Sequence, residues 1–418
     1  MDKKTFKDFG LSKDFTEKLA KRKITIPTEI QLEIIPRILS GKDVIGQSRT
    51  GTGKTIAYLI PLLQLIISKK TSVLIIAPTK ELSIQIYNEA LYYADGLDIK
   101  TIMLTGGESI VKQNEALKKG FDIIVSVPGR LIKLIEEDHL KLSTVKKVVL
   151  DEADFLIDLG FLKDVEKIFS YIKNLEQMMI FSATLSAKTK KILDIVKNQK
   201  ISVRVDSKNS LPQNIENYFF PIQDQDRVKF LLKIIDIISP YLSIIFVRTK
   251  EESRYLYIKL KEKKINSAML NGDMAPSLRK KAIKDFKSAK LQYLVSTDLA
   301  SRGLDHESIT HIINYTLPVD ELDYLHRAGR TGRMNNNGIV YSLCNEIDEA
   351  YLKKYAINLG FDLKPVEIRN KKIEVFKYVG VKPRFNLEET KKRQKIELSK
   401  RKEKNRYADK KNRNKKRR

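Results

Sequence analysis

The sequence contains only one cysteine, Cys344, and its four histidines do not cluster. One cysteine excludes an internal disulfide framework, so we expect no disulfide partner and a cytoplasmic location. The scattered histidines offer no metal-ligand spacing. Residues 1–10 lack the apolar stretch of a signal peptide. The longest apolar run, residues 57–67, is too short to span a bilayer and predicts a buried helix, so we expect no membrane partner.

The composition indicates a folded protein that binds a polyanion. A chain of 418 residues is long enough for two domains, and 42% hydrophobic residues suffice for buried cores. The formal net charge of +27 favours a polyanionic partner. Nucleic acid fits best, although a membrane surface would also attract such a chain.

Short β-branched runs alternate with longer helical patterns in both halves of the chain. Strands that are apolar throughout predict parallel sheets covered on both faces, so two such sets predict two α/β domains. The polar, proline-containing segment 206–213 predicts the linker between them. The predicted strands are Val73–Ala77, Thr101–Leu104, Ile123–Val127, Lys147–Leu150 and Met178–Phe181, then Ser243–Val247, Ser267–Leu270, Tyr293–Val295, His311–Tyr315 and Gly338–Leu343.

The end of the chain has a different composition. Lys391–Arg418 carries 16 Lys or Arg against three acidic residues, about half of the total net charge. Such a block predicts a solvated, disordered tail. We therefore expect a first domain over residues 1–205, a second over 214–362 and a basic tail over 363–418.

A glycine-rich segment with the character of a phosphate-binding loop lies between the apolar pair Val44-Ile45 and a helical pattern. Its glycines let backbone N–H groups surround anionic oxygens at a helix N-terminus. Lys54 is placed to reach the β- and γ-phosphates, and Thr55 to hold Mg²⁺. A glycine-rich turn before a helix is the simpler alternative. The segment comprises Ser48, Arg49, Thr50, Gly51, Thr52, Gly53, Lys54 and Thr55.

Two carboxylates follow the apolar strand that ends at Leu150. The carboxyl end of a parallel strand faces the crevice where ligands of α/β proteins bind. Asp151 is suited to coordinate Mg²⁺ through water, and Glu152 to orient and deprotonate the attacking water. An acidic helix N-terminus would also look like this, because the helix dipole favours negative charge there. The upstream phosphate-binding loop favours a site that hydrolyses a nucleoside triphosphate.

With these motifs the chain resembles the DEAD-box RNA helicases from about Phe6 to about Gly360. The resemblance implies two tandem RecA-like domains and an RNA-stimulated ATPase that uses Mg²⁺. The full set of motifs, in the family's order and spacing, makes the resemblance specific. The motifs are Ile26–Gln31, Ser48–Thr55, Pro78–Leu82, Gly106-Gly107, Pro128–Arg130, Asp151–Asp154, Ser182–Thr184, Leu294–Asp305 and His326–Arg333.

The resemblance also assigns roles at the nucleotide site. It implies that Gln31 reads adenine, a task that an amide with both a donor and an acceptor can perform. Taken alone, Gln31 is an ordinary helix-start residue. The full set of nucleotide-binding residues would be Phe6, Ile24, Gln31, Ser48, Thr50, Gly51, Thr52, Gly53, Lys54, Thr55 and, at the ribose, Asp305.

Two arginines and a group of coupling residues would link the two domains. Arg330 and Arg333 resemble arginine fingers that stabilise charge on the transferring phosphoryl group. A basic helix face is the alternative for both. The residues implied to couple the domains are Asp154, Ser182, Thr184 and His326.

RNA contacts are implied in both domains. Lys80 stands where the family usually has Arg, and Ile24 where it has an aromatic that stacks on adenine. These departures concern RNA affinity and adenine stacking, and they leave the hydrolytic residues intact. The implied RNA-binding residues are Pro78, Thr79, Lys80, Gly107 and Arg130 in the first domain, and Gly272 and Thr297 in the second.

The sequence therefore predicts an ATP-dependent RNA helicase that closes on ATP and RNA, separates duplexes locally and releases RNA on hydrolysis. A non-catalytic RNA-binding clamp or scaffold and a DNA-directed helicase on the same fold are the alternatives. The basic tail favours ribosomal or other structured RNA as the partner. In a eukaryote it would also suit a nuclear or nucleolar address.

Overall fold

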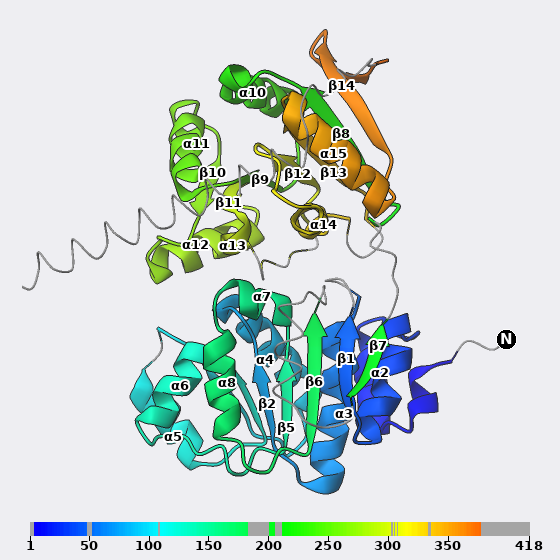
Figure 1. Ribbon diagram of the computed structural model, residues 1–418, viewed down its shortest axis with the longest axis vertical. Helices are drawn as coiled ribbons and strands as arrows, with labels where there is room; N and C mark the ends of the chain where they lie inside the picture. Colours follow the sequence, from blue (N-terminus) through cyan, green and yellow to red (C-terminus); the bar gives the residue numbers. More distant parts are fainter. Residues whose placement is uncertain are drawn as a thin grey trace, which may run out of the picture. The chain divides into compact units, whose positions relative to one another are not determined.

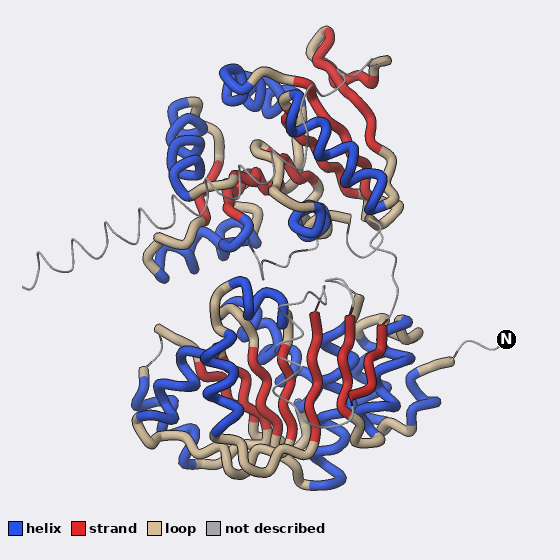
Figure 2. Tube along the Cα trace, viewed as in Figure 1, coloured by secondary structure: helices blue, strands red, loops and turns tan. Residues whose placement is uncertain are grey.

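The computed structural model describes residues 4–47, 52–107, 109–182, 200–204, 211–301, 304, 306, 308–332 and 336–377, and only the backbone of 200–204. The chain forms two compact units, and the main division between them in sequence falls between Asn209 and Ser210 (Figure 1). We call the part of the chain before this division unit 1 and the part after it unit 2. Helices cover both faces of the sheet in unit 1 (Figure 2). Most of the predicted linker, 206–213, lies outside the described residues.

Unit 1 contains a sheet in which every described strand pair is parallel. Its order is β3-β4-β2-β5-β6-β1-β7. In β2 and β5 all four residues are buried, as expected for strands covered on both faces. The strands are β1 Asp43–Gln47, β2 Val73–Ile76, β3 Thr101–Leu104, β4 Ile123–Ser126, β5 Lys147–Leu150, β6 Gln177–Ser182 and β7 Lys200–Arg204.

The helices of unit 1 fall into two groups with separate cores. The helices α1 to α4 pack with the short η1 turn on one face, and α5 to α8 pack on the other. Val73 and Ile75 point to the first core, whereas Leu74 and Ile76 point to the second. The bounds are η1 Phe6–Phe9, α1 Lys13–Lys21, α2 Glu29–Leu39, α3 Lys54–Lys69, α4 Lys80–Ala94, α5 Ile110–Lys118, α6 Pro128–Glu136, α7 Ala153–Asp158 and α8 Leu162–Ser170.

Unit 2 repeats the parallel plan and adds a hairpin at one edge. Its order is β10-β11-β9-β12-β13-β8-β14-β15, and only the β14–β15 pair is antiparallel among the described pairs. The strands are β8 Ile215–Pro221, β9 Ser243–Val247, β10 Ser267–Leu270, β11 Tyr293–Thr297, β12 His311–Asn314, β13 Gly338–Cys344, β14 Leu363–Arg369 and β15 Lys372–Val375.

Helix starts in unit 2 carry recognisable capping residues. Thr249 with Glu252, and Asn345 with Asp348, form capping boxes that begin α11 and α15. Gly360, with φ of 64°, ends α15 in the left-handed conformation. The elements are η2 Asp224–Asp226, α10 Arg227–Ile237, α11 Lys250–Glu262, α12 Pro276–Lys287, α13 Asp298–Ser301, α14 Glu321–Ala328 and α15 Glu346–Leu359.

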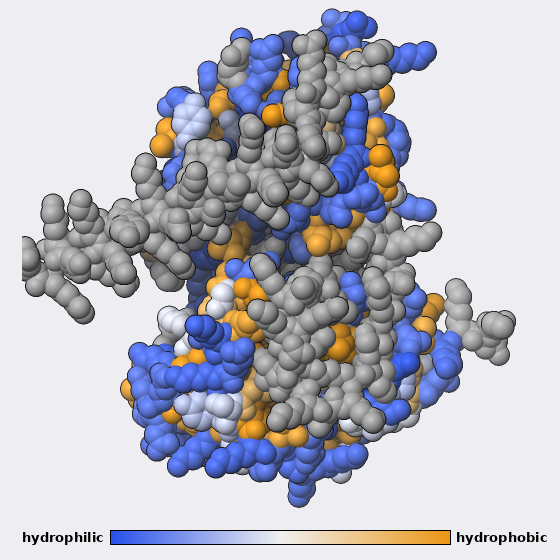
Figure 3. All heavy atoms as spheres, viewed as in Figure 1, coloured by the Kyte–Doolittle hydropathy of each residue, from blue (hydrophilic) through white to orange (hydrophobic). Residues whose placement is uncertain are grey.

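The predicted α/β class with two parallel sheets is confirmed, and each predicted strand is present within two residues of its predicted ends. The tail begins later than predicted. Residues 363–375 form β14 and β15 because Val366, Ile368 and Ile373 pack against the core of unit 2. Residues 378–418, which include the densely charged block, lie outside the described residues. Hydrophilic side chains cover much of the described surface of unit 1 on the face drawn in Figure 3.

The close packing of β1 depends on a glycine. A Cβ added at Gly46 would lie 2.7 Å from Phe181 Cδ1 and 3.1 Å from Ile34 Cδ1. Both neighbours are buried in the first core of unit 1. Only glycine therefore lets α2 and β6 approach this strand, which leads into the glycine-rich loop.

We expect Gly46→Ala to destabilise the protein by about 1–3 kcal/mol, the usual cost of overpacking a core. Thermal unfolding followed by circular dichroism would show a lower midpoint. Gly106→Ala is the control, because a Cβ there meets no atom within 4 Å. Equal midpoints for the two variants would contradict this account of β1.

Candidate functional site

Strand order places the predicted motifs of unit 1 in two groups along one edge of the sheet. Ligands of parallel sheets bind at the carboxyl ends of the strands. Because β5, β6 and β1 are neighbours, Asp151, Ser182 and the glycine-rich loop follow adjacent strands. Because β2, β4 and β3 are neighbours, the loops with Pro78, Arg130 and Gly107 also follow adjacent strands. We call the first group the predicted nucleotide half of this edge and the second group the predicted RNA half.

The described end of the glycine-rich loop is shaped to begin a helix. Gly53 has a left-handed backbone with φ of 87°, and a Cβ there would collide with the Gln31 amide. Lys54 and Thr55 open α3, whose first N–H groups suit an anion. Ser48, Thr50 and Gly51 lie outside the described residues.

Gln31 connects the start of α2 to this loop. Its Oε1 accepts a hydrogen bond from the Thr28 backbone N–H at 2.9 Å, which forms a capping box. Its Nε2 donates to the Gly53 carbonyl at 3.1 Å, and the Thr28 hydroxyl donates to the Thr52 carbonyl at 2.9 Å. Gln31 therefore has the helix-start role that the sequence also allowed, and it positions the phosphate loop. Adenine recognition by Gln31 stays a prediction.

The two apolar residues expected near adenine pack against the core of unit 1. Phe6 is 3% exposed and its ring meets Phe9 edge to face. Ile24 is partly buried against the same core. Both side chains therefore support the segment before α2, and contact of either with a nucleotide stays a prediction.

Asp151 is a buried carboxylate with two hydrogen bonds from the protein. Its Oδ1 accepts from the Glu152 backbone N–H at 2.9 Å, and its Oδ2 accepts from the Tyr58 hydroxyl at 2.8 Å. Burial, aided by the nearby Glu152 charge, raises the Asp151 pKa to about 6, although Lys54 opposes the shift. Tyr58 was not predicted. Its signal is its position four residues after Lys54, on the same face of α3.

Lys54 and Glu152 face each other. Lys54 Nζ lies 3.8 Å from Glu152 Oε1, and the side chains are 6% and 16% exposed. Glu152 has φ of 52° and ψ of 51°, so its backbone is left-handed. Non-glycine residues rarely adopt this conformation, and such strain is often retained at functional sites. The strained turn aims the carboxylate at the phosphate-binding lysine.

The end of β6 is joined to the start of α7. The Asp154 backbone N–H donates to the Ser182 hydroxyl at 3.3 Å, and Asp154 Oδ1 accepts from the Phe155 N–H at 3.0 Å. Ser182 therefore contacts the acidic motif, and its role in coupling to unit 2 stays a prediction. Thr184 lies outside the described residues.

Side-chain hydrogen bonds connect the loops of the RNA half. Lys80 Nζ donates to the Gly106 carbonyl at 2.8 Å, beside the left-handed Gly107. Arg130 Nε donates to Gln113 Oε1 at 2.8 Å, and Gln113 in turn donates to the Thr105 carbonyl. Thr79, which follows Pro78, caps α4 by accepting from the Leu82 N–H at 3.2 Å. The predicted RNA-binding residues of unit 1 thus form one connected surface.

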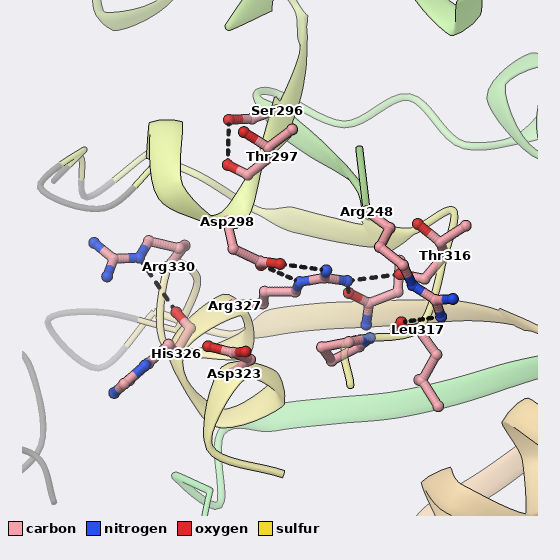
Figure 4. A network of polar contacts seen from close by, with 12 residues as sticks. Arg248, Ser296, Thr297, Asp298, Thr316, Leu317, Asp323, His326, Arg327 and Arg330 are labelled. Carbon is pink, nitrogen blue, oxygen red and sulfur yellow. Dashed lines mark hydrogen bonds and ion pairs between the residues drawn. The ribbon is translucent and has the colours of Figure 1, made fainter. Parts of the chain in front are cut away.

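In unit 2 a buried arginine organises the strand ends (Figure 4). Arg327 Nη2 donates to Asp298 Oδ2 at 2.8 Å, and Nη1 donates to Asn314 Oδ1 and to the Thr316 carbonyl at 2.9 and 2.7 Å. Its guanidinium lies 4.9 Å from the centre of the Phe246 ring. Arg327 thus joins α14 to the ends of β11, β12 and β9. It was not predicted, and its signal was its place between His326 and Arg330.

In Figure 4 the side chain of Arg330 points away from the network around Arg327. Its Nε donates to the His326 carbonyl at 3.2 Å, a contact across one turn at the end of α14. The remaining predicted residues at this site, Arg333 and Asp305, lie outside the described residues.

Gly272 follows strand β10, and Thr297 is the last residue of the adjacent strand β11. Near Gly272, Asp273 accepts hydrogen bonds from Lys250 and Arg254. Ser296 in β11 donates to the Leu270 carbonyl at 3.3 Å. The predicted RNA contacts of unit 2 therefore share one edge, as they do in unit 1.

The described residues contain neither a cluster of metal-ligating side chains nor a membrane-spanning helix. No cluster of three or more His, Cys, Asp or Glu that could hold a metal ion occurs among them. Within the same residues, no helix has both the length and the apolar character that a membrane span needs.

Known proteins resemble this chain over most of its length. Residues 28–192 match the family described as DEAD/DEAH box helicase, and residues 226–335 match the helicase conserved C-terminal domain. The DEAD-box ATP-dependent RNA helicase RhpA of Helicobacter pylori is 35% identical over 367 residues, which cover 88% of this chain and 75% of RhpA. CshA of Bacillus subtilis, with the same description, is 36% identical over 84% of this chain and 71% of CshA.

Solved structures agree with these matches. The structure of S. cerevisiae Dbp5 bound to RNA and ADP BeF3 has a TM-score of 0.77 and 25% identity, covering 87% of this chain and 95% of Dbp5. The structure of Mss116p with its NTE and C-tail deleted, bound to ssRNA and AMP-PNP, has the same TM-score at 26% identity, covering 88% of this chain and 80% of that chain. The motifs, the two parallel sheets and these relatives together show that this chain belongs to the DEAD/DEAH box helicase family.

Proposed function

We propose that this protein is an ATP-dependent RNA helicase that hydrolyses ATP when RNA is bound and separates short duplexes as its two units close. The observation that carries the proposal is the meeting of Lys54, Asp151 and Glu152 at one strand edge. The predicted RNA loops lie farther along that same edge. The relatives named as ATP-dependent RNA helicases and the related structures with RNA support it.

Mg²⁺ fits the oxygen donors at this site. Thr55 and Asp151 would hold the ion, the aspartate through water, because Mg²⁺ prefers oxygen ligands and keeps several waters. When bound, Mg²⁺ supplies positive charge to the phosphate oxygens. The two hydrogen bonds to Asp151 fix the direction of its carboxylate.

Glu152 is the proposed general base, and Lys54 controls its charge environment. The two side chains form an ion pair. When Lys54 turns to the β- and γ-phosphates, Glu152 loses this partner and can take a proton from the attacking water. Arg330 of unit 2 would then stabilise the charge that develops on the transferring phosphoryl group.

The site argues against the first alternative, and an experiment is needed to separate the second. A non-catalytic clamp would not need Lys54 and Glu152 placed against each other beside a buried Asp151. A DNA-directed enzyme would share the fold, and competition between RNA and DNA of one sequence separates it from an RNA helicase. Binding of structured RNA by the basic tail, residues 391–418, is a further part of the proposal.

We expect Glu152→Gln to lower the ATP turnover number by about 10²–10⁴-fold, the usual contribution of a general base. Binding of ATP and RNA should persist, because the amide keeps the shape and relieves Lys54 of its ion pair. Phosphate release and nucleotide titrations would measure both quantities. Lys54→Ala is the comparison, since it should weaken nucleotide binding itself. Wild-type turnover in Glu152→Gln would refute the assignment of the base.

Arg330→Ala should suppress RNA-stimulated hydrolysis and leave RNA binding without nucleotide largely intact, because a finger acts only in the closed state. Arg330 is buried, so thermal unfolding should first show that the variant is folded. Arg369→Ala, which removes an exposed arginine on β14, controls for the loss of one positive charge. ATPase rates with and without RNA, together with RNA titrations, would test this. An undiminished stimulated rate in Arg330→Ala would exclude the finger role.

Removal of residues 391–418 should weaken RNA binding similarly for unrelated sequences. The slope of log K against log salt should flatten by roughly 0.7 for each single-strand phosphate that the tail neutralises. ATPase activity at saturating RNA should persist, since the catalytic groups precede the tail. Identical slopes for the full and shortened chains would show that the tail does not bind RNA.

A further inference from the structure

The positive charge of unit 2 is concentrated on two short segments. Residues 210–377 carry 27 Lys or Arg and 21 Asp or Glu, a net charge of +6. The segments 259–264 and 279–290 alone carry ten Lys or Arg and two acidic residues, a net charge of +8. All other residues of unit 2 together are therefore slightly acidic.

Three of these lysines form a stripe along α12. Lys280, Lys284 and Lys287 follow the spacing i, i+4, i+7, which places them on one helix face, and all three are exposed. The opposite face carries Ala282 and Phe286, which are buried at 7% and 0% exposure. The stripe is thus the solvent face of a helix whose other face belongs to the core.

The stripe continues into the end of α11. Asn266 Nδ2 donates to the Lys290 carbonyl at 2.8 Å, which joins the loops that precede β10 and β11. Lys263 and Lys264 in the first loop, and Lys290 in the second, are exposed. Lys264 has φ of 57°, a backbone conformation that favours glycine. We name Lys280, Lys284, Lys287, Lys290, Lys263 and Lys264 the lysine track.

Two ordinary explanations do not account for the track. Lysine near a helix C-terminus interacts favourably with the helix dipole, which explains Lys284 and Lys287 in the last turn of α12. It does not explain Lys280, which lies near the start of α12, a helix with no acidic residue in its first turn. Salt bridges do not account for it either, because no track lysine pairs with a carboxylate within the part of the chain that the structure describes.

The position of α12 connects the track to the RNA edge. The helix begins four residues after Gly272, at the carboxyl end of β10, and ends before the amino end of β11. Its 12 residues span about 18 Å. Figure 1 shows α11 and α12 beside β10 and β11. An RNA strand that runs from the predicted contact at Gly272 along α12 would therefore meet one lysine after another.

We propose that the lysine track is a second RNA-binding surface, which holds the phosphate backbone of RNA outside the strand-end edge. This inference rests on the proposed RNA helicase function. Lysine heads without aromatic neighbours bind phosphates and do not read bases, so the contact is independent of sequence. It lengthens the RNA segment that the protein holds without touching the ATP site.

The test compares two full-length variants with equal net charge. The track variant carries Lys280→Gln, Lys284→Gln and Lys287→Gln. The control variant carries Lys229→Gln, Lys233→Gln and Lys354→Gln, three exposed lysines on α10 and α15. Fluorescence anisotropy without nucleotide measures the binding of a short single-stranded RNA and of one several times longer, at several salt concentrations.

For the long RNA we expect the track variant alone to bind more weakly, with a salt slope flatter by about 2, because three lysines no longer neutralise phosphates at about 0.7 each. Affinity for the short RNA and the ATPase rate at saturating RNA should match the wild type.

Equal effects in both variants, or no effect in the track variant, would overturn the proposal. An absence of RNA-stimulated ATPase in the wild type would instead overturn the proposed function. An acidic protein that binds the wild type but not the track variant, with RNA affinity unchanged, would also exclude RNA as the partner.

Discussion

The nucleotide half of unit 1 depends on one buried carboxylate, that of Asp151. An isolated charge in a protein interior is costly, so it must be hydrogen-bonded or paired. The Tyr58 hydroxyl and the Glu152 N–H meet its two oxygens, and Lys54 supplies a compensating charge. These contacts come from α3, β5 and α7, so one carboxylate fixes the mutual positions of the elements that carry the catalytic groups.

In unit 2 a buried positive charge, the guanidinium of Arg327, joins several elements in the same way. Arg327 is buried, and its guanidinium is held by Asp298, Asn314 and the Thr316 carbonyl. A planar guanidinium with several donors is suited to join groups from different strands. Arg330 lies one turn farther along the chain, on a segment that Arg327 anchors. Each unit therefore has a rigid buried charge beside the group proposed to act on ATP.

Much of the fold follows from the sequence because the strands of a doubly covered sheet are apolar throughout. The short strand β1 was harder to predict, since only Val44 and Ile45 are clearly apolar and Gly46 is required by packing. The hairpin of β14 and β15 was included in the tail because its lysines obscure the apolar residues Val366, Ile368 and Ile373. Only the folded structure shows that these three residues pack against the core of unit 2.

Motifs of neighbouring residues, such as those that contain Lys54 and Asp151, were enough to find residues that the structure brings together. Tyr58 and Arg327 were missed because their roles depend on partners far along the chain. Tyr58 meets a carboxylate 93 residues away, and Arg327 meets one 29 residues away. The sequence predicted the local capping role of Gln31 but not its contact with Gly53. Both contacts use the same side-chain amide, and only the fold brings Gly53 close to it.

In the proposed function, RNA binding controls ATP hydrolysis at the Asp151 site. The most direct measurement is the rate of phosphate release by the full-length protein with ATP and Mg²⁺, titrated with single-stranded RNA and, separately, with DNA of the same sequence. The account predicts a low basal rate that rises to saturation with RNA and changes little with DNA. A rate that is independent of RNA, or that DNA raises equally, would contradict it.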